Sequence, residues 1–296
     1  MLATLGDVAQ DIVVWRLEDV RHATDTKSRI ETHRGGSAAN VASFAAPRYP
    51  TRFIGRVGKD MAGVAVTSNL ESLGADVKMQ VDEEEPSGMI VVLIEDDGER
   101  LMFPSRGANT TLETVDPAWL EDVELLHLTG YSFSEGTAAK SALKAAKAVK
   151  AKGGKISLDL SSTGMMEDYG VEEFLNLVEE LDPDIITANR DECLLAGLAD
   201  GGTPGPNLAR FPRTIVLARQ GADATAVFED GKLLAMVPVP PVEEVRDLTG
   251  AGDAFNAGFL TAHLQGATPV EACEAGHALA ARVLAQPGAN EPPLEG

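Results

Sequence analysis

Residues 247–260, DLTGAGDAFNAGFL, constrain the fold and the chemistry of this chain more than any other stretch. Gly250 and Gly252 permit a positive φ or a close approach of the backbone to a ligand. The apolar residues that follow have helical spacing, which places the glycine turn at a helix N-terminus. Free N–H groups and the positive end of the helix dipole then meet at one point, where a phosphate oxygen fits. Asp253, in the first helical turn, is either a general base beside that point or only a helix cap.

Two better-known glycine motifs do not explain this turn. GxGxxG would require Gly where Phe255 stands, and GxxxxGK[ST] is absent from the 296 residues. The turn is therefore neither a dinucleotide fingerprint nor a P-loop.

Three motifs in register carry a resemblance to a known family. The segment DLTGAGD at 247–253 resembles the DTxGAGD signature of the ribokinase-like carbohydrate kinases, the PfkB family. GGSAAN at 35–40 and NRDE at 189–192 are similar to two further signatures, a Gly-Gly pair followed by Asn and an Asn-x-x-Glu. Their order and separation match over essentially the whole chain. The resemblance implies an ATP-dependent kinase that transfers the γ-phosphoryl group to a hydroxyl of a small sugar.

The resemblance also implies roles for individual residues. Asp253 is the expected base, with Gly250, Ala251 and Gly252 as the anion hole. The acceptor sugar is expected to contact Asp11, Gly35, Gly36 and Asn40, and the nucleotide Asn189, Arg219 and Gly221. A carboxylate such as Asp11 can accept hydrogen bonds from two adjacent hydroxyls. The alternative for Asp11 is a solvated loop aspartate, and that alternative is stronger for Asp7.

A hydrated Mg²⁺ is expected near the start of a mid-chain helix. Asn189 and Glu192 are three residues apart there, so their side chains can share a face. An amide and a carboxylate suit Mg²⁺, which keeps several waters and takes few protein ligands. The alternative is an N-cap at Asn189 with Glu192 completing a capping box. The resemblance favours magnesium, bound by Glu192 through water.

A monovalent cation loop is a further implication of the resemblance. Asp247 and Thr249, with carbonyl groups near Gly288 and Ala289, are similar to that loop, although Leu248 stands where Thr is common. Potassium is therefore a second candidate cofactor.

Departures from the family pattern leave the acceptor open. Ser37 stands where ribokinases carry Lys, which disfavours ribose, and Ala218 replaces the first Gly of the nucleotide-side turn. The acceptor could instead be a nucleoside such as adenosine, or a keto-sugar acid whose carboxylate meets Arg106. A non-catalytic sugar-binding sensor is a third alternative, which the intact Asp253 disfavours.

The pattern of elements predicts one ribokinase-like α/β domain over residues 1–296. Strands and helices alternate beyond residue 109, which predicts a mostly parallel sheet flanked by helices, with ligands at the carboxyl ends of the strands. A hairpin around the Asp96-Asp97-Gly98 turn predicts a small sheet from about 12–33 and 86–104. In the family this sheet is a lid over the sugar and can also form a homodimer contact.

Composition excludes several partners. The net charge of −21 and the pI near 4.6 argue against nucleic acid and anionic membrane surfaces. Cys193 and Cys273 form no CxxC pair, which is typical of a reducing compartment. No run of about 18 apolar residues and no leader pattern occurs at the start of the sequence given. We therefore expect a soluble, cytoplasmic protein.

Overall fold

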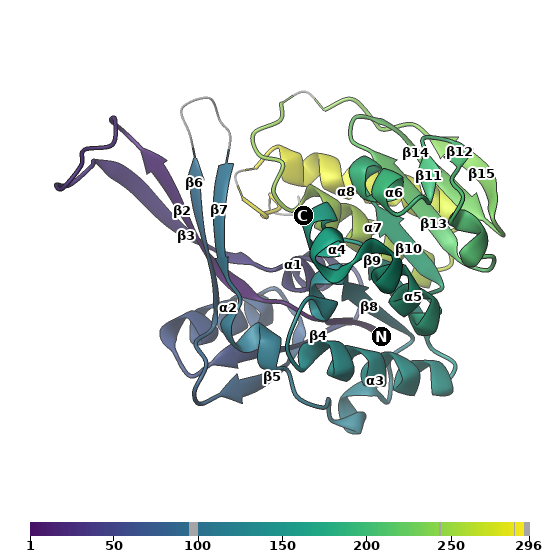
Figure 1. Cartoon of the computed structure of the whole chain (residues 1–296), viewed down its shortest axis with the longest axis horizontal. Coiled ribbons are helices and arrows are strands. Elements are labelled where there is room, and N and C mark those ends of the chain that lie inside the picture. Colours follow the sequence, from purple (N-terminus) through teal and green to yellow (C-terminus); the bar gives the residue numbers. More distant parts are fainter. Residues whose placement is uncertain (95–99, 243, 287, 293–296) are drawn as a thin grey trace.

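A large sheet forms the centre of the molecule (Figure 1). The computed structural model describes residues 1–94, 100–242, 244–286 and 288–292. Within these ranges the large sheet has the strand order β15-β14-β13-β10-β9-β8-β1-β4-β5. Neighbours from β13 to β5 run parallel, whereas β14 is antiparallel to both β13 and β15. The bounds are β1 Leu2–Leu5, β4 Thr51–Gly58, β5 Asp76–Asp82, β8 Leu125–Thr129, β9 Lys155–Asp159, β10 Ile185–Ala188, β13 Ile215–Gln220, β14 Asp223–Glu229 and β15 Lys232–Val237.

Helices cover both faces of this sheet (Figure 1). Successive residues of β8 show why, because Leu125 packs into one apolar core and Leu126 into another. A strand buried on both faces reads as a continuous apolar run, as in most parallel sheets. The helices are α1 Ser37–Ala45, α2 Met61–Ser72, α3 Ala138–Ala151, α4 Thr163–Tyr169, α5 Val171–Leu181, α6 Arg190–Leu195, α7 Ala251–Leu264 and α8 Pro269–Leu284. The predicted α/β class, a mostly parallel sheet flanked by helices, is confirmed.

A second, smaller sheet stands off from the main body (Figure 1). Its order is β3-β2-β6-β7, with β2 and β6 parallel in the middle and antiparallel partners at both edges. The strands are β2 Ala9–Arg16, β3 Ser28–Gly35, β6 Gly88–Ile94 and β7 Arg100–Ser105. The predicted hairpin is confirmed by the pairing of β6 with β7. Its predicted turn, Asp96 to Gly98, lies outside the described residues.

Element boundaries differ modestly from the predicted ones. The small sheet was expected to begin at about residue 12 but begins at Ala9, because β2 pairs with β3 along its whole length, polar positions included. Helix α4 and the short ladder of β11 (Ala199–Asp200) with β12 (Thr203–Pro204) were not predicted. Both lie in segments whose local pattern is weak.

None of the helices in the described ranges combines the length and the apolar composition needed to cross a membrane.

The topology gathers chemically active side chains at one edge of the sheet. Asp7 follows β1, Gly130 follows β8, Asp159 ends β9, Asn189 follows β10 and Arg219 lies near the end of β13. These strands are parallel neighbours, so their carboxyl ends open on the same side. Ligands of open α/β sheets bind at that edge.

Candidate active site

The glycine turn lies at the N-terminus of α7, as predicted. Gly250 is the N-cap residue with a left-handed φ of 77°, and no side chain among the described residues caps the helix. The N–H of Ala251 already donates to the carbonyl of Leu248 at 3.3 Å. A Cβ on Gly250 would lie 2.6 Å from the Cβ of Ala289, so this position needs glycine for both conformation and space.

Asp253 is held by two side chains of α1. Ser37 Oγ donates to Asp253 Oδ1 at 2.6 Å, and Asn40 Nδ2 donates to Asp253 Oδ2 at 2.7 Å. Burial raises the pKa of Asp253 to about 7, and the charges of Asp159 and Asp7 add to the rise against these two donors. A carboxyl that changes protonation near neutrality is suited to general-base chemistry. This is not the geometry of a helix cap, because both carboxylate oxygens face another helix.

Asp11 and the glycine pair lie close together. The Asp11 side chain is buried, and its Oδ1 has no hydrogen-bond partner among the described residues. Burial raises the Asp11 pKa to about 6, against the opposing charge of Arg34. A Cβ on Gly35 would lie 2.0 Å from Asp11 Oδ1, and Gly36 has a φ of 92° with the carbonyl oxygen of Asp7 only 2.6 Å from its Cβ position. Both glycines are therefore required by internal packing.

Asp7 has a structural partner that sequence reasoning missed. Its carboxylate accepts the backbone N–H groups of Ser37 at 2.9 Å and Ala38 at 3.2 Å. Thr129 Oγ1 donates to it at 3.3 Å. Asp7 thus fixes the start of α1, the helix that carries Ser37 and Asn40, so the alternative of a solvated loop aspartate does not hold for Asp7.

Arg219 lies across the first turn of α7. Its Nη2 donates to Asp159 Oδ2 at 2.9 Å, and its guanidinium carbon is 5.7 Å from the ring centre of Phe255. A Cβ on Gly252 would lie 2.5 Å from Arg219 Nη1. The second glycine of the turn therefore leaves room for a guanidinium group beside the predicted anion hole.

Asp159, at the end of β9, holds this arginine through an ion pair. The buried carboxylate also accepts from Thr187 Oγ1 at 2.8 Å and Asn256 Nδ2 at 2.7 Å. Burial acts to raise its pKa, but the charge of Arg219 and these donors outweigh it, so the net shift is downward. Asp159 ends a strand at the ligand edge, and that position was the signal that could have found it.

Asn189 and Glu192 form the capping box that was the alternative to magnesium. Asn189 Oδ1 accepts the N–H of Glu192 at 3.0 Å, and Glu192 Oε2 accepts the N–H of Asn189 at 2.8 Å. Burial and the charge of Asp159 raise the pKa of Glu192 to about 7. Across the described ranges no group of three or more His, Cys, Asp and Glu side chains is arranged to hold a metal. Glu192 is buried, and its second oxygen, Oε1, accepts from Asn189 Nδ2 at 2.6 Å, so both carboxylate oxygens contact Asn189.

The predicted cation loop is closed by backbone contacts. Asp247 Oδ1 accepts the N–H of Thr249, and Asp247 Oδ2 accepts that of Gly288, both at 2.8 Å. The carbonyl of Gly288 accepts from the N–H of Asn290 at 2.8 Å.

Gly221, which was expected to contact the nucleotide, lies in an exposed turn with a φ of 65°, and no atom lies within 4 Å of its Cβ position.

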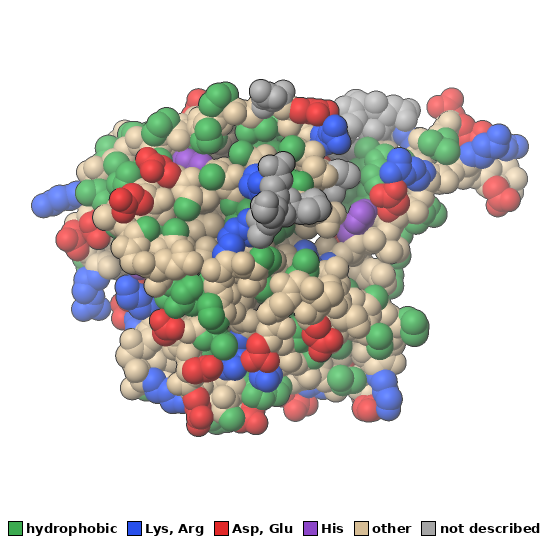
Figure 2. All heavy atoms as spheres, turned by 180° about the vertical axis from the view of Figure 1, so that it is seen from behind, with side chains coloured by type: hydrophobic (Ala, Val, Ile, Leu, Met, Phe, Trp, Pro, Cys, Tyr) green, Lys and Arg blue, Asp and Glu red, His purple; other side chains and the backbone are tan. Residues whose placement is uncertain are grey.

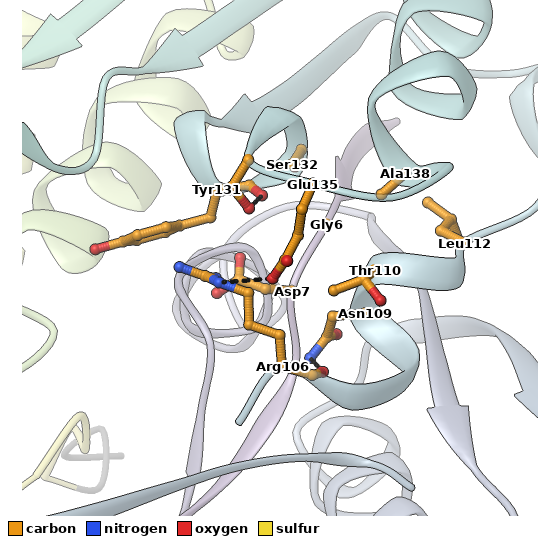
Figure 3. Close-up of a pocket in the computed structure, with 11 residues that line it drawn as sticks. Gly6, Asp7, Arg106, Asn109, Thr110, Leu112, Tyr131, Ser132, Glu135 and Ala138 are labelled. Atoms are coloured by element: carbon orange, nitrogen blue, oxygen red, sulfur yellow. Dashed lines mark hydrogen bonds and ion pairs between the residues drawn. The ribbon is translucent and has the colours of Figure 1, made fainter. Parts of the chain in front are cut away.

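Arg106 borders a small cavity beside Asp7 (Figure 3). Its guanidinium lies 4.8 Å from the ring centre of Tyr131 and 3.8 Å from Glu135. Asn109 bonds to the backbone of Val8 through both amide atoms, which ties the loop after β7 to the start of β2. Arg106 therefore lies beside Asp7, whereas the residues expected to contact the acceptor, Asp11, Gly35, Gly36 and Asn40, do not line this cavity.

An acidic residue beside the helix N-terminus of a glycine turn, at the carboxyl edge of a parallel sheet, is an arrangement suited to a phosphate-bearing ligand. The family model described as "pfkB family carbohydrate kinase" matches residues 1–295 of this chain. The chain belongs to this family, and the resemblance drawn from its motifs is confirmed.

Three curated relatives are kinases of different small molecules. The chain is 29% identical over 287 residues to a ribokinase of Arabidopsis thaliana, covering 90% of this chain and 71% of the relative. It is 29% identical to an adenosine kinase of Dictyostelium discoideum, covering 90% and 83%. It is 31% identical to an ATP-dependent ribose-1-phosphate kinase of Halopiger xanaduensis, covering 97% and 93%.

Solved structures share the fold. An adenosine kinase from Sinorhizobium meliloti superimposes with a TM-score of 0.86 at 23% identity, covering 99% of this chain and 96% of that one. A putative ribokinase II from E. coli, in complex with ATP and Mg²⁺, has a TM-score of 0.83 at 22% identity, covering 97% and 94%. The chain is an enzyme of the carbohydrate kinase class.

Proposed function

We propose that this protein transfers the γ-phosphoryl group of ATP to a hydroxyl of a small sugar, with Asp253 as the general base. The observation that carries the proposal is the position of Asp253. Its carboxyl has a pKa of about 7 and lies in the first turn of α7. It accepts hydrogen bonds from Ser37 and Asn40 of α1, the helix that begins directly after the glycine pair beside Asp11.

The proposed roles follow from this arrangement. Asp11, whose Oδ1 is buried without a partner, accepts sugar hydroxyls, and Asn40 directs one of them towards Asp253. Asp253 takes the proton as that oxygen attacks the γ-phosphorus, and the bond from this phosphorus to the β,γ-bridging oxygen breaks to release ADP. The N–H groups of the turn from Gly250 to Gly252, together with Arg219, stabilise the charge on the transferring phosphoryl group.

Asn189, Arg219 and Gly221 remain the proposed nucleotide side of the site. Mg²⁺ would be contacted by Glu192 through water and would neutralise phosphate charge. The structural relative in complex with ATP and Mg²⁺ supports the choice of these two ligands. Glu192→Gln removes the charge, and we expect a higher Mg²⁺ requirement. Glu271→Gln, the same change in the exposed capping box of α8, should leave that requirement unchanged. Potassium at Asp247 and Thr249 rests on the resemblance alone.

The small sheet is proposed to close over the acceptor as a lid within a single domain. Closure would exclude water, which a kinase needs to avoid hydrolysing ATP. Leu101 and Phe103 on one face of the edge strand β7, and Met102 on the other face, are exposed, and we propose this edge as the contact with a second copy. Sedimentation at several protein concentrations tests the dimer.

The two free buried thiols and the use of ATP fit a cytoplasmic setting.

An ADP-release assay with Mg·ATP tests the reaction and the base. Run against pentoses, hexoses, sugar acids, sugar phosphates and nucleosides, it should show turnover on one class. Asp253→Asn should lower that turnover by about 10²- to 10⁴-fold, because a positioned base contributes that much. ATP binding should be nearly unchanged. A variant with wild-type turnover would remove Asp253 from the role.

An anionic acceptor is the second candidate, favoured by Arg106. Its nearest carboxylate, Glu135, is 3.8 Å away and more than half exposed, so the guanidinium has capacity for another anion. One of the relatives is named as a kinase of ribose-1-phosphate, which is an anionic sugar. Arg106→Gln should lower kcat/KM for sugar acids or phosphates while sparing neutral sugars. An equal loss on both classes would leave the neutral sugar as the better proposal.

A further inference from the structure

Arg34 joins the small sheet to the helices around the candidate base. It lies at the end of β3, directly before Gly35 and Gly36. Its Nη1 donates to Asn40 Oδ1 and its Nη2 to Ser43 Oγ at 2.8 Å, both in α1. Its Nε donates to Asn69 Oδ1 of α2 at 3.0 Å. One side chain thus links β3, α1 and α2.

The contact with Asn40 decides which way that amide faces. Arginine has donors and no acceptor, so only the carbonyl oxygen of Asn40 can face it. The NH₂ group of Asn40 must then point the other way, where it donates to Asp253 Oδ2 at 2.7 Å. If the amide were flipped, the NH₂ group of Asn40 would face the N–H donors of Arg34, and the carbonyl oxygen of Asn40 would face the carboxylate of Asp253. Neither pair could form a hydrogen bond.

We infer that Arg34 is a positioning residue for the reaction, because it fixes the Asn40 amide and thereby the orientation and ionised form of Asp253. This inference rests on the proposed role of Asp253 as base. Nothing in the glycine motifs requires an arginine at position 34, so the assignment comes from the geometry of this chain.

The charges around the base show why a fixed cation matters there. Asp7 from the turn after β1 and Asp159 from the end of β9 both raise the Asp253 pKa. On the basic side are Arg34 and, beside Gly252, Arg219. Burial lowers the pKa of Arg34 to about 10 while the charges of Asp253 and Asp11 oppose that shift, so Arg34 is charged at neutral pH. Removing this charge favours the protonated, inactive form of Asp253.

Two substitutions separate the charge from the orientation. Arg34→Met should lower kcat about 10-fold or more and move the acid limb of the kcat–pH profile upward by about one pH unit, with little change in KM for ATP. Arg34→Lys keeps the charge but not the planar fork, so its acid limb should stay near that of the wild type while kcat still falls. Arg29→Met, on the exposed part of the same strand, is the matched control.

A double-mutant cycle tests the path through Asn40. The cycle is measured at a pH above the acid limb, where Asp253 is ionised in every variant. If Arg34 acts through that amide, Arg34→Met should there lower kcat little further in an Asn40→Ala background. Additive losses in kcat would overturn the inference. So would an Arg34→Met enzyme with wild-type kcat and pH profile.

The outcomes distinguish this inference from the proposed function. Full turnover by Asp253→Asn would remove the base itself. Loss of turnover by Asp253→Asn together with an unaffected Arg34→Met would keep the base and reject Arg34. If Arg34→Met does not fold, Asn69→Ala, which removes only the Nε acceptor, replaces it. We expect a lower kcat with an unchanged acid limb from Asn69→Ala, and a wild-type kcat would contradict the inference.

Discussion

Three carboxyl groups in and around the site have raised pKa values. Burial is the main cause for Asp11, with a pKa of about 6, and for Glu192 and Asp253, each with a pKa of about 7. Buried carboxyls of this kind are unfavourable for folding at neutral pH, so they are typical of sites arranged for chemistry. Asp253 combines the raised pKa with a place beside an uncapped helix N-terminus.

The raised pKa of Asp253 makes the stability of the protein pH-dependent. The unfolded carboxyl ionises near 3.8 and the folded one near 7, so the folded state binds more protons between these values and loses stability as pH rises through that window. Asp253→Asn removes this loss. Its melting temperature should therefore gain on that of the wild type between pH 4 and pH 8.

Calorimetry at pH 4, 6 and 8 measures the effect. Asp19→Asn removes the same charge from an exposed turn and serves as the control. A difference between Asp253→Asn and the wild type that does not vary with pH would contradict the assigned shift.

At the scale of elements, the two glycines of the α7 turn serve different purposes. Gly250 has a left-handed φ of 77° and no space for a Cβ beside Ala289. Gly252 has no positive φ in this turn, and the atom nearest its Cβ position is the end of the flexible Arg219 side chain. Gly250 is therefore required by its left-handed backbone conformation, whereas Gly252 is required by the space that the Arg219 side chain occupies.

Alanine substitutions should therefore differ in kind. Gly250→Ala should destabilise the protein by about 1–3 kcal/mol, because it strains the backbone. Gly252→Ala should displace Arg219 and raise KM for ATP, with a smaller change in melting temperature. Chemical denaturation and steady-state kinetics on both variants check this, and Gly221→Ala, at an exposed left-handed turn, is a control for conformational strain alone. Equal losses of stability at 250 and 252 would contradict the distinction.

The whole molecule carries a large excess of negative charge. The net charge is −21, and Figure 2 shows acidic side chains scattered among basic ones over the face in view. Such an excess opposes compaction through self-repulsion, and salt screens it.

Added salt should therefore raise the melting temperature. We expect a gradual rise from 0.1 to 2 M salt, at about 2–4 °C for each kcal/mol gained. Screening predicts equal effects of NaCl and KCl, whereas a larger effect of KCl would favour the potassium site at Asp247 and Thr249. A melting temperature that falls with both salts would contradict the role of self-repulsion.

Much of the fold could be predicted from local sequence. The mostly parallel sheet flanked by helices and the hairpin of β6 with β7 were predicted, because buried parallel strands are short apolar runs between helical segments and a hairpin has a local turn signal. The ends of β2 could not be predicted, since they depend on pairing with β3. The pair Asn189 and Glu192 was found, but its capping box and its burial beside Asp159 were not decided by spacing.

The sequence by itself determined the family, the parallel sheet, the glycine turn and the candidate base, because each depends on residues close together in the chain. Only the tertiary structure decided what surrounds that base. Asn40 lies 213 positions before Asp253 and still donates a hydrogen bond to it. Asp7 from the turn after β1, Arg34 from β3 and Asp159 from β9 also reach the surroundings of this base. Burial and these charges set the proton affinity of Asp253, and both arise only when the distant segments pack together.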